Sequence, residues 1–206
     1  VLSKSTDKRL HFQKFEPIPG NIFFDNDEIN FAKRELGPLT DKPFVFINPA
    51  VRGKISEKNK QWGFEKYQKI VNNNPNINFV QCEDGLKYTK WLDNVKRIVT
   101  YTYRLSCSVM SHATCYISNE GGMVHGGAAV GIPGVVLYGH YTNPKSLGYK
   151  GNINFAVDDP EYPYGCGTIH KTCDKCLESM KNIPVEKVEK SLLEMYNRLI
   201  KQPEEN

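Results

Sequence analysis

The chain has 206 residues, of which 39% are hydrophobic and 24% are charged. This composition is typical of a globular domain that buries a core, and it excludes collagen, coiled coils and bulk disorder. No apolar run approaches the roughly 20 residues that span a bilayer, so we expect no transmembrane segment. The net charge of +4 is spread along the chain. Because nucleic-acid-binding proteins concentrate basic residues on one face, we expect no nucleic-acid partner, whereas a small phosphate-bearing ligand fits this charge.

The N-terminal residues VLSKSTDKRL contain no apolar stretch of the kind found in signal peptides. Six cysteines are too few for a disulfide scaffold of this length. Both features indicate a reducing, cytoplasmic location. The chain begins with valine and not with methionine, so we expect it to be processed, trimmed or part of a longer protein.

Residues 1–43 contain scattered prolines and glycines, and we expect a lead-in or linker there with one short helix at 27–36. From 44 to 206, short apolar runs alternate with amphipathic segments. The runs predict strands at 44–48, 77–81, 95–101, ATCYISN ending at Asn119, 134–139 and 153–157. The amphipathic segments predict helices at 62–71, 105–112, 123–130 and 184–200. This alternation predicts one α/β domain, a Rossmann-like parallel sheet with helices on both faces, whose ligands bind beyond the carboxyl ends of the strands.

The most informative segment is the strand-to-helix turn at Glu120, Gly121 and Gly122. Two glycines let a ligand approach the backbone closely, and a helix N-terminus presents free N–H groups and partial positive charge to a phosphate. The Glu120 carboxylate suits the hydroxyl groups of a sugar better than a phosphate. His125 lies about one turn into the expected helix, from where its side chain can face back toward the ligand.

Each of these features has a structural alternative. Glu120 alone would also fit a carboxylate stabilised by the helix dipole, and His125 alone would fit a hydrogen-bonded core histidine. Their combination at one strand end favours a binding site. We leave the catalytic residue unassigned, with His125 as the one candidate.

Two further groups follow other strand ends on the same rim. Arg52 and Lys60 lie in the basic loop after the first strand, where they would complement a diphosphate. Thr100, Tyr101 and Thr102 follow the third strand and offer aromatic and hydroxyl groups to a nucleotide base. A solvated loop is the alternative for any single lysine.

These residues resemble glycosyltransferase family 9, the heptosyltransferase-like enzymes of bacterial lipopolysaccharide synthesis. The family has Asp-Ser/Thr-Gly-x-x-His before an Ala-rich helix, a proline, an apolar strand, a glycine and a later proline. The matching residues are EGGMVH at 120–125, Ala128, Ala129, Pro133, VVLYG at 135–139 and Pro144. Lys60-Gln61-Trp62 and Arg104-Leu105-Ser106 resemble two further family elements. Glu120 stands where the family has Asp, and Gly121 where it has a hydroxyl residue.

The resemblance implies one half of a two-domain GT-B fold that binds a nucleotide-diphosphate sugar without a cofactor. It implies that Glu120 binds the donor sugar, that Gly122 and the helix start bind the diphosphate, and that Lys60 binds a phosphate. A missing N-terminal half would supply the glycan or lipid-linked acceptor and the general base. The location would be cytoplasmic, with a peripheral position at the inner membrane as the alternative. A non-catalytic nucleotide or nucleotide-sugar binding module, or a zinc-stabilised interaction domain, are the competing interpretations.

A late cysteine cluster remains outside this interpretation. Cys166, Cys173 and Cys176, with His170 between them, contain enough ligands for one tetrahedral zinc site. Because the spacing is irregular, we expect reduced thiols without metal first, zinc second and a disulfide third.

Overall fold

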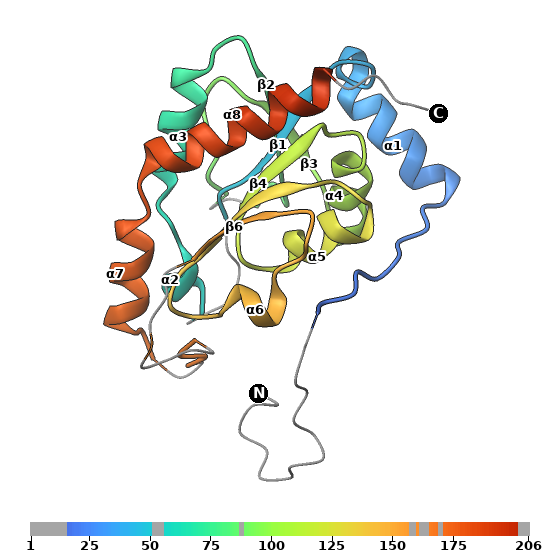
Figure 1. Ribbon diagram of the computed structural model, residues 1–206. Helices are drawn as coiled ribbons and strands as arrows, with labels where there is room; N and C mark the ends of the chain where they lie inside the picture. The colour runs from blue at the N-terminus through green and yellow to red at the C-terminus, as the bar shows by residue number, and fades with distance from the viewer. Residues whose placement is uncertain are drawn as a thin grey trace.

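The structure is a computed structural model that describes residues 16–50, 56–86, 89–156, 160, 165–168 and 171–201. Six strands form one sheet (Figure 1). They are β1 (Phe44–Asn48), β2 (Asn78–Glu83), β3 (Lys96–Val99), β4 (Cys115–Asn119), β5 (Gly134–Tyr138) and β6 (Ile153–Ala156). All six expected strands are present within a few residues of their predicted ends.

The strand order is β3-β2-β1-β4-β5-β6, and every neighbouring pair is parallel. The chain therefore adds β2 and β3 on one side of β1 and then crosses to the other side for β4, β5 and β6. This is the Rossmann-like order with one reversal, between β1 and β4. The predicted fold class is confirmed.

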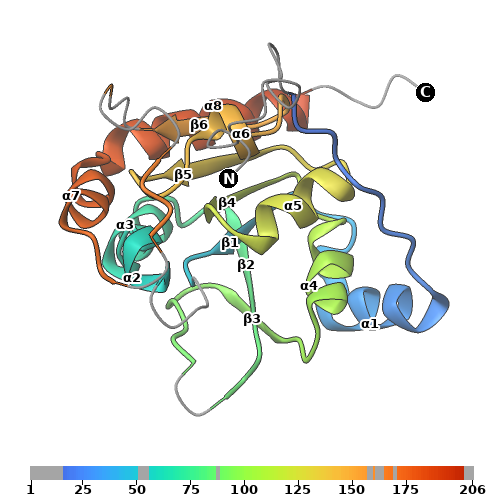
Figure 2. The same cartoon turned by 90° about the horizontal axis from the view of Figure 1, so that it is seen from below.

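Helices surround the sheet on both faces (Figure 2). The α-helices are α1 (Asn26–Leu36), α2 (Ser56–Lys60), α3 (Phe64–Asn73), α4 (Tyr103–Met110), α5 (Gly122–Ala129), α6 (Pro144–Leu147), α7 (Asp174–Asn182) and α8 (Val185–Lys201), and one 3₁₀ turn, η3 (Gly37–Leu39), follows α1. Among the described residues, none of these helices has both the length and the apolar character needed to cross a bilayer.

Side chains that alternate along the strands pack into two separate hydrophobic cores, one on each face of the sheet. In β1, Val45 and Ile47 belong to the core under α3 and α8, whereas Phe44 and Phe46 belong to the core under α1, α4 and α5. The central strands β1, β4 and β5 are buried on both faces, as is typical of a parallel sheet, whereas β3 and β6 at the edges are more exposed. In β1 and β5 a continuous apolar run therefore replaces a period-2 alternation of polarity.

The segment before β1 contributes to the second core. Asp25 and Glu28 form a reciprocal capping box at the start of α1, which fixes where the helix begins. Ala32 and Leu36 on α1 are fully buried and pack in the same cluster as residues of α4 and α5. Residues 26–39 are thus tied to the sheet by apolar contacts as well as by chain connection.

The structure corrects the sequence prediction in four places. Trp62 lies before α3 and not within it, because Gly63 has φ +115° and separates Trp62 from the helix. Residues 56–60, expected as loop, form α2, and 144–147 and 174–182, where no helix was predicted, form α6 and α7. The three missed helices are short and contain few apolar residues.

A small-residue face lets α5 lie close to the sheet. A Cβ atom at Gly127 would lie 2.5 Å from Cε1 of the buried Tyr116 ring. We therefore expect Gly127→Ala to lower the free energy of unfolding by about 1–3 kcal/mol, although alanine is the better helix former. Urea denaturation measures this difference. Gly151→Ala is the matched control, because a Cβ there meets no atom within 4 Å, and its stability should be unchanged. Equal stability of both variants would contradict the packing argument.

Candidate functional site

The candidate site lies where the strand order reverses. The carboxyl ends of β1 and β4 are adjacent, with Asn48 paired in register with Ser118. A cavity of about 400 Å³ opens there, and its walls include Asn48, Asn119 and the turn after β4. In open parallel sheets the loops diverge at such a reversal and leave room for a ligand.

The turn at residues 120–122 presents the start of α5 to this cavity. Gly121 is the N-cap residue, and no side chain caps the free amides that follow it. A Cβ at Gly121 would meet no atom within 4 Å, and one at Gly122 would meet only the Tyr103 ring at 3.6 Å. The space over this turn is therefore open, and uncapped N–H groups border it.

Glu120 and Lys60 form an ion pair on the wall of the cavity. Lys60 Nζ lies 2.9 Å from Glu120 Oε2, and the two side chains are 16% and 8% exposed. The same ammonium lies 4.5 Å from the centre of the Tyr141 ring. Thr142 Oγ1 donates to Glu120 Oε2 over 3.3 Å. The structure thus brings together two residues that the sequence placed on one rim, and it pairs them with each other.

Buried polar side chains hold the chain around this ion pair. Asn119 Oδ1 accepts from the Trp62 backbone N–H, and Asn119 Nδ2 donates to the Pro49 carbonyl. Trp62 Nε1 donates to the Ile183 carbonyl over 2.9 Å. Asn119, at the end of β4, therefore holds the segment that follows β1 at both Pro49 and Trp62, two residues after Lys60.

The expected base-binding residues also belong to the cavity wall. Thr100, Tyr101 and Thr102 all line it. Thr100 is buried, with its hydroxyl 2.6 Å from the Ser106 hydroxyl, whereas Tyr101 is 78% exposed. The Thr102 hydroxyl caps α4 by accepting from the Leu105 N–H.

Tyr103 connects this wall to the glycine turn. Its hydroxyl donates to the Gly122 carbonyl over 2.9 Å. Burial raises the pKa of Tyr103 well above its ordinary value, so the phenol keeps the proton that this hydrogen bond uses. Tyr103 thereby fixes the position of the first residue of α5.

His125 is exposed on α5, and it is not among the residues that line the cavity. Its Nδ1 lies 2.8 Å from the Tyr149 hydroxyl, and the two rings meet edge to face. Arg52, the other expected diphosphate ligand, lies outside the described residues.

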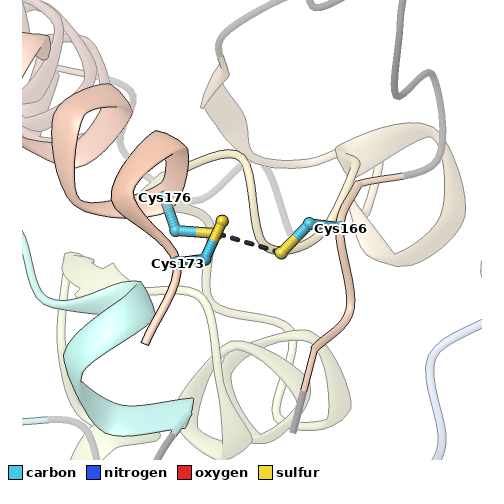
Figure 3. Close-up of side chains that lie close together, drawn as sticks. All are labelled: Cys166, Cys173 and Cys176. Atoms are coloured by element: carbon cyan, nitrogen blue, oxygen red, sulfur yellow. Dashed lines mark hydrogen bonds between the residues drawn. The ribbon is translucent and has the colours of Figure 1, made fainter. Parts of the chain in front are cut away.

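The late cysteines converge in space (Figure 3). The Sγ atoms of Cys166, Cys173 and Cys176 all lie within 4.8 Å of one another, and Cys166 and Cys176 are 3.1 Å apart. Burial raises the pKa of Cys176. At Cys173 burial acts in the same direction, but hydrogen bonds from nearby backbone amides and thiols outweigh it and lower the pKa. His170, which the sequence suggests as a fourth ligand, lies outside the described residues.

No protein-family model and no curated protein matches the sequence significantly. Solved structures do match. ADP-heptose lps heptosyltransferase II of E. coli matches 86% of this chain and 54% of its own, with a TM-score of 0.60 and 13% identity. A family 9 glycosyltransferase from Veillonella parvula DSM 2008 matches 88% and 54%, with a TM-score of 0.60 and 18% identity. The iron-containing dodecameric glycosyltransferase TibC from enterotoxigenic E. coli H10407 matches 78% and 48%, with a TM-score of 0.58 and 16% identity.

The chain has the fold of a heptosyltransferase-like family 9 glycosyltransferase. This confirms the predicted resemblance at the level of the fold. The chain spans about half the length of the solved family 9 structures that it matches.

Several residues of the site were not selected from the sequence. Asn119 and Asn48 were recognised only as the ends of strands. An asparagine at the carboxyl end of both strands beside the reversal could have identified them as site residues. Glu83, the last residue of β2, and Asp84, which follows it, line the cavity, and their position at a strand end could have identified them. No sequence pattern could have identified Asn59 as part of the site, because its side chain contacts segments more than 100 residues away.

The buried ion pair should be strongly coupled energetically. We expect Lys60→Met and Glu120→Gln each to destabilise the fold, because each leaves a largely buried charge without its partner. The double variant should lose less than the sum, with a coupling of about 1 kcal/mol or more in a double-mutant cycle measured by urea denaturation.

The matched control is the Lys69–Glu186 pair on the surface, whose side chains are 53% and 72% exposed. Its cycle should show no measurable coupling, since solvent screens exposed pairs. Additive effects at Lys60 and Glu120 would show that their contact does not stabilise the site.

Proposed function

We propose that the chain is the donor-binding half of a glycosyltransferase that uses a nucleotide-diphosphate sugar. The observation that carries the proposal is the uncapped start of α5, which borders the cavity at the strand reversal beside Lys60 and Glu120. Free N–H groups at a helix start bind phosphate oxygens, and an adjacent ammonium adds positive charge. ADP-heptose, named for the similar E. coli enzyme, belongs to this class of donor.

Each part of the cavity suits one part of such a donor. The diphosphate would lie over Gly121 and Gly122, with Lys60 bridging it to Glu120. The Glu120 carboxylate would accept hydrogen bonds from sugar hydroxyls. Thr100, Tyr101 and Thr102 would contact the base, and Glu83 and Asp84 would favour ribose hydroxyls, because carboxylates repel phosphate and accept from O–H groups.

The reaction also requires an acceptor and a base. The proposed acceptor is a glycan or a lipid-linked sugar of lipopolysaccharide or another cell-surface polymer, held by a second half. Within the described residues, Glu120 is paired with Lys60, and His125 contacts Tyr149 outside the cavity wall. Neither is placed to take a proton from an acceptor hydroxyl, so the proposal assigns the base to the facing half.

Donor binding can be tested at Gly122. We expect isothermal titration of ADP and ADP-heptose to show binding to the wild type. Gly122→Val should raise the Kd at least about 30-fold, about 2 kcal/mol, because the branched side chain covers the amides of the helix start. Gly151→Val is the control, since a Cβ there meets no atom within 4 Å. Equal affinity of a folded Gly122→Val variant and the wild type would remove the diphosphate assignment.

Catalysis gives a second test. The 206-residue chain should bind the donor but show no transfer to a lipopolysaccharide-core acceptor, because substrate positioning worth roughly 7–11 kcal/mol requires both halves. Fusion to the N-terminal half of a family 9 enzyme should allow transfer. Radiolabelled sugar incorporation measures both. Transfer by the chain alone that His125→Ala abolishes would instead make His125 the catalytic residue.

A further inference from the structure

Three thiols from two separate segments converge beside the donor site. Cys166 belongs to residues 165–168, which follow the sheet, whereas Cys173 and Cys176 lie at the N-cap and in the first turn of α7. Their side chains point toward one another (Figure 3). Among the described residues, this is the only group of three or more potential metal ligands whose donor atoms come together.

The arrangement fits a metal better than either alternative. Tetrahedral coordination with metal–sulfur distances of roughly 2.3 Å places sulfur atoms roughly 3.8 Å apart. The three Sγ atoms lie within 4.8 Å of one another, with Cys166 and Cys176 at 3.1 Å, so small side-chain movements bring them to this spacing. A disulfide would use two sulfurs at about 2.05 Å and leave the third without a role. Core packing does not explain the cluster either, because Cys166 and Cys173 are partly exposed.

We propose that Cys166, Cys173 and Cys176 bind one thiophilic divalent metal ion, Zn²⁺ or Fe²⁺, through three thiolates. Each thiol gives up its proton to solvent as its metal–sulfur bond forms, and no electron is transferred. The three sulfurs form one face of the coordination tetrahedron. The ion fastens residues 165–168 to the start of α7.

Both fastened segments hold parts of the donor site. On the α7 side, the fully buried Asn59 accepts from the Cys173 N–H over 2.8 Å. Its side-chain amide donates to the Lys171 carbonyl over 3.2 Å. Asn59 directly precedes Lys60, so the position of the cysteine segment determines where Lys60 lies.

On the other side, the Cys166 N–H donates to the His140 carbonyl and the Gly167 N–H to the Tyr141 carbonyl. Gly165 has φ +82°, and a Cβ there would lie 2.6 Å from the Tyr141 carbonyl oxygen, so the two segments are closely packed. The Tyr141 ring contacts Lys60, and the next residue, Thr142, hydrogen-bonds Glu120. The metal thus positions both partners of the ion pair, and this second step rests on the proposed function.

The metal site is tested without any nucleotide. The wild type, Cys173→Ser and Cys115→Ser are purified under reducing conditions, and zinc and iron are measured by elemental analysis. We expect about one equivalent in the wild type and in Cys115→Ser, whose buried thiol lies in the sheet, and at least tenfold less in Cys173→Ser. Cys166→Ser should behave like Cys173→Ser, which guards against misfolding of one variant.

The absorption spectrum of bound cobalt tests independently whether sulfur atoms are the metal ligands. Co²⁺ added to stripped wild-type protein should give sulfur-to-cobalt charge-transfer and tetrahedral d–d absorption, both lost in Cys173→Ser. Absence of metal together with absence of these bands would overturn the site. A mass 2 Da lower than that of the reduced chain, lost on reduction, would show a disulfide and overturn it too.

The positioning role is tested by titrating ADP into metal-loaded, chelator-stripped and reloaded protein. Stripping should raise the Kd at least about fivefold, the lower end of typical coupling between sites. Reloading should restore the affinity of the wild type but not that of Cys173→Ser. Unchanged ADP affinity in stripped protein would overturn the positioning role. No ADP binding by any form, with one metal bound, would instead refute the proposed function and leave the metal site standing.

Discussion

The reversal of strand order between β1 and β4 is the constraint on which the site depends. Strands added on both sides of β1 send their following loops in opposite directions, so the carboxyl ends of β1 and β4 lie together without a covering connection. Asn48, Asn119 and the 120–122 turn meet at this point. The cavity is therefore a consequence of topology, and the side chains decide what it can hold.

Buried polar contacts make this open edge rigid. Asn119 bridges Pro49 and Trp62, and Trp62 is anchored in turn to the Ile183 carbonyl just before α8. Such groups cost free energy unless every donor and acceptor is paired, so a satisfied network favours one arrangement of its loops. Lys60 and Glu120 form an ion pair beside these hydrogen-bonded segments, and both side chains are largely shielded from solvent.

The cysteine cluster is hydrogen-bonded to the segments that carry the ion pair. Asn59 connects it to α2, and the backbone contacts of Cys166 and Gly167 connect it to the chain after β5. A region that the sequence analysis treated as a separate motif is thus continuous with the candidate functional site. Residues 56–60 and the described stretches 165–168 and 171–176, more than 100 positions away, form one structural unit beside the sheet.

The sequence by itself determined the fold class and indicated where the candidate site lies. Short apolar runs bounded by turn residues, such as FVFIN at 44–48 before Pro49, are typical of strands buried on both faces. Paired glycines at 121–122 indicate a strand-to-helix turn. Both patterns are local, so they can be recognised in the sequence without knowing which residues they contact in the folded chain. The residues at the ends of β1, β3 and β4 could be selected because parallel strands all end on the same edge.

Tertiary structure decided which of these residues meet. It paired Lys60 with Glu120, directed His125 toward Tyr149, and brought Cys166 to within 3.1 Å of Cys176. It also gave Asn59 its role through contacts with residues 171 and 173. These outcomes depend on the relative positions of segments far apart in the chain, which residue spacing does not encode, because packing of helices and loops on the sheet sets them.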